Sequence, residues 1–406
     1  MNYSNFLDEE GINRVLSSNN VGIPLMSVDN KYLSISDEVL GYQPNNLVIA
    51  SKGSNSINNT ILPFVDNIIN YNENFIIYDN YNIYETFKTK LVNNNYKIIL
   101  LNFDNMENSD GYNIFDIIEN IYKKQDYKAI SLLDDTILSM FADEGSSDPF
   151  WIISARNLFK GLVIYQLEKN ERVNLMTIYK IVQDFIDGDK ALEFLNNYDK
   201  ESLVYINLSN ILLAPPETRK SIISVFNQLM NMYLSSNELI SIINNSDYDL
   251  FDLVNNKFVI FVRGNNYYSK IITNIIINQL NQFITKKCNI ILPDFDMINP
   301  IKNFSKIIND NKNINYTITI SSYSNLKNIY GLEQSEIIKM CFENTIYLYS
   351  QDIKTLDEIS YRCGNRDIDT PLIDPFELLR LNKDEAIILM SRVYPIKIKL
   401  GGMKNE

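Results

Sequence analysis

Short runs of consecutive apolar residues alternate with longer stretches in which apolar residues recur every three or four positions. The short runs predict strands buried on both faces, and the stretches between them predict helices. The predicted strands are Leu47–Ala50, Asn74–Asp79, Lys97–Phe103, Lys257–Val262, Asn289–Leu292, Tyr316–Ser321, Asn344–Tyr349 and Glu385–Met390. The helices expected between them include Ile57–Ile69, Tyr84–Val92 and Ser269–Phe283. This alternation is typical of an α/β fold with a mainly parallel sheet.

In the middle of the chain the strand pattern disappears. From 114 to 245 the apolar residues follow helical spacing, most clearly over Phe150–Leu167, Val173–Ile186 and Ser221–Leu234. The pattern therefore predicts a core formed by residues 41–113 and 246–400, with an inserted all-α domain over 114–245. Residues 1–40 are an N-terminal segment with two short strand candidates, Val21–Met26 and Lys31–Ser34, and residues 401–406 are a tail.

Charge and residue usage exclude several classes of site. A net charge of −13 argues against direct DNA binding, because non-specific affinity for nucleic acid comes mainly from Lys and Arg at the phosphates. The chain contains no histidine, which excludes His-based catalysis and His metal ligands, and we expect no metal site. Three widely spaced cysteines favour a reducing cytoplasm. The sequence contains no apolar run of about 18 residues, so no transmembrane segment is predicted.

The turn between the first predicted strand and helix is placed like a phosphate-binding loop. Such loops follow G-x-x-x-x-G-K-[ST], in which the lysine contacts the β- and γ-phosphates and the hydroxyl contacts magnesium. In that register the four defining positions hold Ala50, Asn55, Ser56 and Ile57. The lysine and the hydroxyl are therefore both absent in register.

Three other residues of this turn are nucleotide-binding candidates. Lys52 is the one lysine of the loop and could reach a phosphate from a displaced position, although we favour a solvated turn lysine. Gly53 and Ser54 could offer backbone N–H groups to an anion, or could simply form the turn.

Carboxylates follow two of the predicted strands, at the end where α/β proteins place their sites. Asp294 and Asp296 come after Asn289–Leu292 and could act together as a metal site or a base. A solvated strand end after Pro293 is the alternative that we favour. Asp79 ends another strand and could cap the turn before the next helix.

Several local patterns resemble those of the type IV secretion coupling proteins, the conjugative DNA-transfer ATPases. The resemblance covers residues 41–400 and rests on their order and spacing. The similar stretches are Pro63 after the loop, Asn74-Phe-Ile-Ile-Tyr-Asp79 with Tyr84-Glu85, Ser109-Asp-Gly-Tyr-Asn-Ile-Phe115, Ser147-Asp-Pro-Phe-Trp151, Ser321-Ser-Tyr-Ser-Asn-Leu-Lys-Asn-Ile-Tyr-Gly331 and Ile359-Ser360 with Gly364. The resemblance implies a RecA-like P-loop core with an inserted all-α domain, ATP and magnesium as cofactors, and a hexameric ring.

The chain also departs from this family at the positions that carry its chemistry. Pro293 stands where the resemblance implies a magnesium-linked aspartate, and Asp294 stands at the water-activating glutamate. Ser321 replaces a glutamine after the fourth core strand, and little of the family's Asp-Pro-Lys-Gly-Glu motif remains after Asp79. Losing these groups together is better explained by relaxed demand for hydrolysis than by a variant mechanism.

We therefore expect a coupling-protein-like component of a conjugative DNA-transfer or type IV secretion system that acts as a scaffold or adaptor, a pseudo-ATPase. The alternative is an active DNA-transfer motor with a deviant loop, in which Lys52 binds phosphate and Asp294 activates water. ATP and magnesium are cofactors only in that case. Expected partners are proteins of the apparatus, including an intact coupling ATPase. The expected location is the cytoplasm, with any association with the inner face of the membrane being peripheral.

Overall fold

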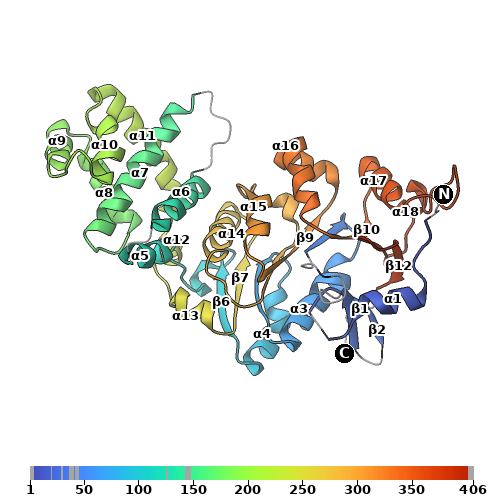
Figure 1. Ribbon diagram of the computed structural model, residues 1–406. Coiled ribbons are helices and arrows are strands. Elements are labelled where there is room, and N and C mark those ends of the chain that lie inside the picture. Colours follow the sequence, from blue (N-terminus) through green and yellow to red (C-terminus); the bar gives the residue numbers. More distant parts are fainter. Residues whose placement is uncertain are drawn as a thin grey trace. The chain divides into compact units, whose positions relative to one another are not determined.

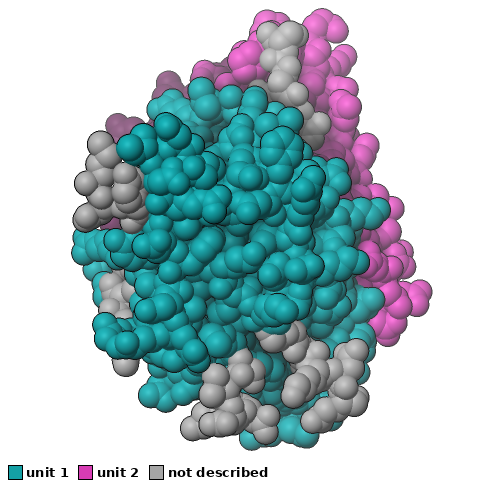
Figure 2. All heavy atoms as spheres, turned by 90° about the vertical axis from the view of Figure 1, so that its right-hand side faces the viewer, with its two compact units in different colours: residues 1–100, 254–265, 284–406 teal, residues 101–253, 266–283 magenta. Residues whose placement is uncertain are grey.

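The computed structural model describes residues 4–19, 21–28, 31–35, 41, 45–124, 127–141 and 148–400. The chain forms two compact units, coloured separately in Figure 2. Unit 1 contains residues 1–100, 254–265 and 284–406, and unit 2 contains 101–253 and 266–283. The units change at 100/101 and 253/254, whereas the sequence predicted domain boundaries at 113/114 and 245/246, and unit 2 also includes a helix that the strand–helix alternation assigned to the core. Ser147 and the tail 401–406 lie outside the described residues.

A nine-stranded sheet forms the centre of the α/β fold (Figure 1). Its order is β12-β11-β10-β4-β9-β8-β5-β7-β6. The strands are β4 (Asn46–Ala50), β5 (Asn74–Asp79), β6 (Lys97–Asn102), β7 (Phe258–Arg263), β8 (Cys288–Leu292), β9 (Ile314–Ile320), β10 (Asn344–Tyr349), β11 (Glu385–Met390) and β12 (Ile396–Lys399). From β10 to β7 each neighbouring pair is parallel, whereas β11 and β12 are antiparallel. The prediction of a mainly parallel α/β sheet is confirmed, and the sequence analysis missed β12.

Helices of unit 1 connect these strands. They are α1 (Glu9–Val15), the π-helix η1 (Ile57–Ile61), α3 (Leu62–Asn70), α4 (Ile83–Asn93), the 3-10 turn η3 (Phe295–Met297), α15 (Phe304–Asp310), α16 (Tyr323–Met340), α17 (Ile353–Cys363) and α18 (Pro375–Leu379). Apolar side chains of α3 and α4 pack against those of β4, β5 and β7, and Phe64, Ile77 and Val259 are typical members of this core. The apolar runs therefore form strands because both faces of the sheet are covered.

A small antiparallel sheet of order β1-β3-β2 precedes the large one. Its strands are β1 (Leu16–Ser17), β2 (Pro24–Val28) and β3 (Lys31–Ile35). The second strand begins three residues later than the sequence pattern indicated, although Val21 and Ile23 are buried before it. Buried residues of this sheet, including Leu25 and Ile35, belong to the same core as α3 and β12.

Buried asparagines form hydrogen bonds at the amino-terminal ends of central strands in the large sheet. The side chain of Asn45 accepts a hydrogen bond from the Tyr316 backbone N–H at 2.8 Å and donates one to the Cys341 carbonyl at 3.2 Å. The next residue, Asn46, donates to Thr317 Oγ1 at 3.1 Å and accepts from Asn344 Nδ2 at 3.2 Å. These contacts satisfy polar groups that the sheet leaves at its edge. They explain why asparagine, a poor strand former, begins several strands here.

Unit 2 is helical. Its helices are η2 (Met106–Asn108), α5 (Asp116–Lys123), α6 (Lys128–Met140), α7 (Phe150–Glu168), α8 (Leu175–Asp184), α9 (Gly188–Asn196), α10 (Leu203–Leu212), α11 (Pro216–Tyr233), α12 (Asn237–Asn244) and α14 (Tyr267–Leu280), and α13 (Leu250–Asn255) spans the boundary with unit 1. Pro216 opens α11, where its missing backbone N–H costs no helix hydrogen bond. Gly161 allows α7 and α10 to pack closely, because a Cβ there would lie 2.6 Å from the Leu208 side chain.

A buried arginine holds two helix connections of unit 2 together, α8–α9 and α10–α11. The Arg219 side chain is 6% exposed and donates to the carbonyls of Phe185 at 3.0 Å, Leu212 at 3.4 Å and Ala214 at 3.3 Å. These carbonyls lie at or just beyond the carboxyl ends of α8 and α10, where a helix leaves acceptors unsatisfied and favours a cation. Arg219 is therefore a structural cation, which agrees with the absence of a phosphate-binding pattern around it.

Candidate active site

The loop after β4 makes a tight turn whose one lysine points into solvent. Ser54 is buried, and its N–H donates to the Ser51 carbonyl at 3.1 Å. Gly53 and Asn55 adopt positive φ angles of 95° and 56°. A Cβ at Gly53 would meet nothing within 4 Å, so backbone conformation, and not lack of space, favours glycine there. Lys52 is exposed. The loop is a turn of the expected kind, and Lys52 lies on its exposed surface.

Asparagine side chains fix the start of the following helix. Asn59 donates to the Lys383 carbonyl at 2.7 Å and accepts from Asn55 at 3.2 Å, while Asn58 donates to Asn55 at 2.8 Å. The first turns form a π-helix, a rare geometry that often marks functional sites. Ile57, at the position of the magnesium-binding hydroxyl, is partly buried and packs against the hydrophobic core of unit 1. Its side chain thus contributes to packing.

Ser321 joins the ends of four neighbouring strands. Its N–H donates to Asp296 Oδ2 at 2.8 Å, and its hydroxyl donates to the same oxygen. Its carbonyl accepts from Ser51 Oγ at 2.9 Å and Ser350 Oγ at 3.0 Å. Asn325 Nδ2 adds a contact to Ser321 Oγ at 2.7 Å. The carboxyl ends of β8, β9, β4 and β10 are therefore connected by hydrogen bonds between polar side chains and backbone.

Asp79 performs the capping role that the sequence predicted. It is 1% exposed, and its two carboxylate oxygens accept from the backbone N–H groups of Tyr81 at 3.1 Å, Ile83 at 2.8 Å and Tyr84 at 3.0 Å. The turn that it holds places Tyr81 over the next strand end, where the Tyr81 hydroxyl donates to Asp294 Oδ2 at 2.5 Å.

The two carboxylates after β8 have separate partners. Asp294 adopts φ 51°, receives the Tyr81 hydroxyl, and donates its own backbone N–H to Thr319 Oγ1 at 2.7 Å. Asp296 is 7% exposed and accepts a hydrogen bond from the Ser321 N–H. Burial raises the pKa of Asp294, the charge of Asp296 raises it further, and the Tyr81 hydrogen bond opposes both. Asp294 is thus more basic than an ordinary aspartate, as a general base would be.

The arginine at the end of β7 is paired with a carboxylate of α4. Arg263, at the end of β7, forms an ion pair with Glu85 at 3.1 Å. Within the described ranges no group of three or more acidic or cysteine side chains is arranged to hold a metal ion. Lys52 after β4 is exposed, and Asp294 after β8 has a raised pKa.

Comparison with known proteins identifies the origin of this arrangement. Residues 38–370 match the family model for type IV secretory system conjugative DNA transfer. The chain belongs to this family. None of the described helices combines the length and apolar character that a membrane span needs.

Solved structures show the same fold. The bacterial conjugative coupling protein TrwBdeltaN70 in its unbound form matches with TM-score 0.73 and 12% identity, over 100% of this chain and 93% of that one. TrwB in complex with ADP and Mg²⁺ matches with TM-score 0.74 and 12% identity, over 100% and 95%. VirB4 of Thermoanaerobacter pseudethanolicus matches with TM-score 0.57 and 12% identity, over 95% and 97%. No curated protein sequence matches. The fold is therefore the RecA-like P-loop fold of conjugative coupling proteins.

Within this family fold, sequence reasoning found the strand ends but missed the groups that connect them. Sequence reasoning gave no role to Tyr81, Ser51, Ser350 or Asn325, and their roles depend on contacts across 29 to 270 positions of the chain. The Tyr81 contact spans 213 positions. Short polar residues directly after apolar strands were the one available signal, and that signal does not specify pairing.

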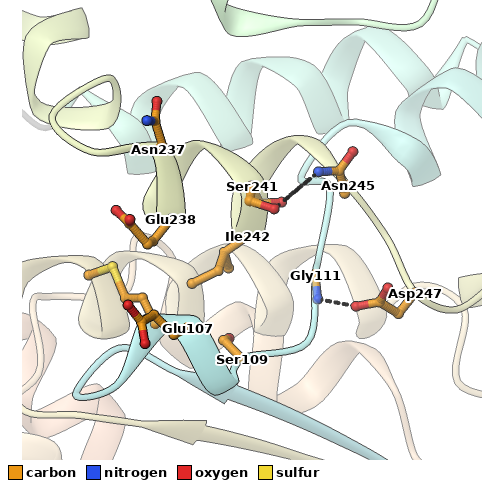
Figure 3. Close-up of a pocket in the computed structure, with 10 residues that line it drawn as sticks. Glu107, Ser109, Gly111, Asn237, Glu238, Ser241, Ile242, Asn245 and Asp247 are labelled. Carbon is orange, nitrogen blue, oxygen red and sulfur yellow. Dashed lines mark hydrogen bonds between the residues drawn. The ribbon is translucent and has the colours of Figure 1, made fainter.

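Unit 2 of this family member contains a separate cavity of about 500 Å³ beside α12 (Figure 3). Glu238, Ser241 and Ile242 of α12 line it together with Glu107 and Ser109 around η2, as Figure 3 shows. No Lys or Arg is among its lining residues. Phosphate groups would meet carboxylates here, so this cavity is unsuited to a nucleotide.

Proposed function

We propose that this protein is a coupling-protein-like component of a conjugative DNA-transfer or type IV secretion system that does not hydrolyse ATP and acts as a scaffold or adaptor. The observation that carries the proposal is Ile57. It stands where a P-loop enzyme has the hydroxyl ligand of magnesium, and it packs against the core instead. Without that ligand and without the adjacent lysine, replaced by Ser56, the loop lacks both groups that bind the triphosphate and its metal.

The carboxylates support the same proposal. Asp296 uses one oxygen to accept both polar groups of Ser321, which commits it to holding strand ends together. The metal-linked aspartate expected from the family is Pro293, whose side chain has no ligand atom. Bringing a triphosphate beside Asp294 and Asp296 without a bound cation would set negative charges against one another.

Nucleotide binding is the direct test. Isothermal titration calorimetry of the full chain with ATP and Mg²⁺ should show no saturable heat up to about 1 mM ATP, the upper end of ordinary substrate affinities. Phosphate release should not exceed that of buffer. Lys52→Ala and Asp294→Asn should leave both results unchanged, as should Lys327→Ala, a matched exposed lysine on α16.

An active motor with a deviant loop would give a different set of results. It requires magnesium-dependent binding and turnover that Lys52→Ala and Asp294→Asn abolish and Lys327→Ala does not. That pattern would refute the proposed loss of hydrolysis.

The adaptor role has its own measurement. In cells that carry the transfer system, DNA transfer should fall when this chain is removed and should be restored by wild type, Lys52→Ala or Asp294→Asn alike. We infer that its partners are proteins of the apparatus, including an intact coupling ATPase, and that it acts in the cytoplasm with peripheral contact to the membrane. Restoration by wild type alone would contradict a purely structural role.

A further inference from the structure

Helix α10 of unit 2 carries two apolar faces, and one of them is uncovered. Val204, Leu208 and Ile211 are buried on the side that packs against α7. Leu203, Ile206 and Leu213 are 42%, 55% and 55% exposed. Spacings of three and seven residues place these three on one stripe of the helix, opposite the buried set.

The composition of α10 is unusual for a surface helix. Its ten residues, LVYINLSNIL, contain no charged side chain. The exposed face of a surface helix usually carries charged residues, and α10 has none. The three large apolar side chains form one uncovered stripe about 15 Å long, at 1.5 Å per residue. A second helix can pack its own apolar face against such a stripe.

The neighbouring surface is acidic. Helix α9 packs beside α10, and both lie together in Figure 1. The segment 184–201, which contains α9 and leads into α10, has two lysines against six carboxylates: Asp184, Asp187, Asp189, Glu193, Asp199 and Glu201. One of the lysines, Lys190, pairs with Asp184 at 2.7 Å. With two lysines against six carboxylates, this segment has a net charge of −4, and its helix α9 packs against α10.

From these two observations we propose that the exposed stripe of α10 (Leu203, Ile206 and Leu213) is the docking site for a helix of a partner protein whose own apolar stripe is flanked by Lys and Arg. The apolar stripe supplies the binding energy, and the acidic segment 184–201 selects the basic flanks. A second copy of this chain would bring a second acidic segment to the same place. An anionic membrane surface would be repelled in the same way. The proposal is independent of whether the protein hydrolyses ATP.

The test uses the full chain and a defined probe. A fluorescently labelled helical peptide of about 18 residues, built from Leu on one stripe and Lys elsewhere, is titrated by fluorescence anisotropy. A control peptide has the same Leu stripe with Glu in place of Lys. We expect saturable binding of the Leu–Lys peptide and weaker binding as salt rises, because the charged part of the contact is screened. The Leu–Glu peptide should bind far less.

Point variants locate the contact. Ile206→Ser and Leu213→Ser should each weaken binding of the Leu–Lys peptide roughly tenfold or more, because each removes a large apolar side chain from the contact. The matched control is Ile153→Ser, the same change at a residue that is 47% exposed but lines a groove between α6 and α7. It should bind like wild type. Circular dichroism melting of each variant verifies that unit 2 is folded.

Four results would overturn the proposal. Equal loss in Ile153→Ser, or no loss in folded Ile206→Ser and Leu213→Ser, would place binding elsewhere. Self-association in sedimentation equilibrium that Ile206→Ser abolishes would make a second copy the occupant. Cosedimentation with phosphatidylcholine or phosphatidylserine vesicles that Ile206→Ser abolishes would make a membrane the occupant.

Discussion

Asp294 and Asp296 are two positions apart at the same strand end, and we predict that neutralising them changes stability in opposite directions. Asp296 is buried and accepts the Ser321 N–H at 2.8 Å and the Ser321 hydroxyl. Hydrogen bonds to a charged acceptor contribute about 1.5–3 kcal/mol each. The two share one oxygen and are not additive, so we expect Asp296→Ala to lower the free energy of unfolding by about 2–4 kcal/mol.

Neutralising Asp294 should instead raise the stability of the folded protein. Burial and the neighbouring charge raise its pKa, which means that the folded protein favours the neutral form more than the unfolded chain does. Asp294→Asn keeps an oxygen for the Tyr81 hydroxyl and removes the buried charge. This variant should therefore be more stable than wild type near neutral pH.

Differential scanning calorimetry of the full chain measures both effects. For a domain of about 150–250 residues, 1 kcal/mol corresponds to roughly 2–4 °C in Tm, so the unit 1 transition should fall by about 5–15 °C in Asp296→Ala. Asp296→Asn, which retains one acceptor oxygen, should lie between it and wild type. The reasoning is refuted if Asp296→Ala leaves Tm unchanged while abolishing a magnesium-dependent rise in Tm with ATP, because Asp296 would then be a metal-site residue.

Three further outcomes are expected. The pKa of Asp294 is raised in the folded state, so the folded protein binds this proton more tightly than the unfolded chain does. The contribution of the proton to stability is greatest below the unfolded pKa of about 3.9 and is lost as pH rises through the folded pKa. In melts taken across this pH range, the Tm advantage of Asp294→Asn should therefore disappear at low pH. Arg219→Met should lower the stability of unit 2 by about 3–5 kcal/mol, because three buried carbonyls lose a charged donor, measured as the shift of the unit 2 transition in urea. Asn45→Ala should cost about 1–3 kcal/mol by leaving a buried N–H and a buried carbonyl unpaired, detectable by faster amide exchange at Tyr316.

The strands of the large sheet could be predicted because burial on both faces leaves a direct signal in the sequence. Val48, Ile77, Val259 and Ile291 stand in uninterrupted apolar runs, and all are fully buried. β12 gave no such signal, since its residues Ile396–Lys399 alternate buried and exposed over four positions. A short strand at the edge of a sheet has too few residues for its pattern to be distinguished from a loop.

The site was predictable in position but not in its connections. The end of each strand is visible in the sequence, and parallel strands bring those ends to one edge, so Asp79, Asp294 and Ser321 could be assigned to it. The pairing of Tyr81 with Asp294, and not Asp296, depends on the left-handed conformations at Asn82 and Asp294, which no spacing rule indicates. Local backbone geometry, set by tertiary contacts, thus decided which polar groups meet.

Loss of a catalytic group and gain of a structural one can occur at the same positions. In a P-loop enzyme the nucleotide and its metal ion bind at the carboxyl ends of the strands and contact polar groups there. In this chain Ser51, Ser350 and Asp296 satisfy one another through Ser321. Because buried polar groups must find partners, an edge that no longer binds a ligand is stable only if its side chains pair internally. Under the function proposed above, the hydrogen bonds around Ser321 would satisfy these polar groups without a bound nucleotide.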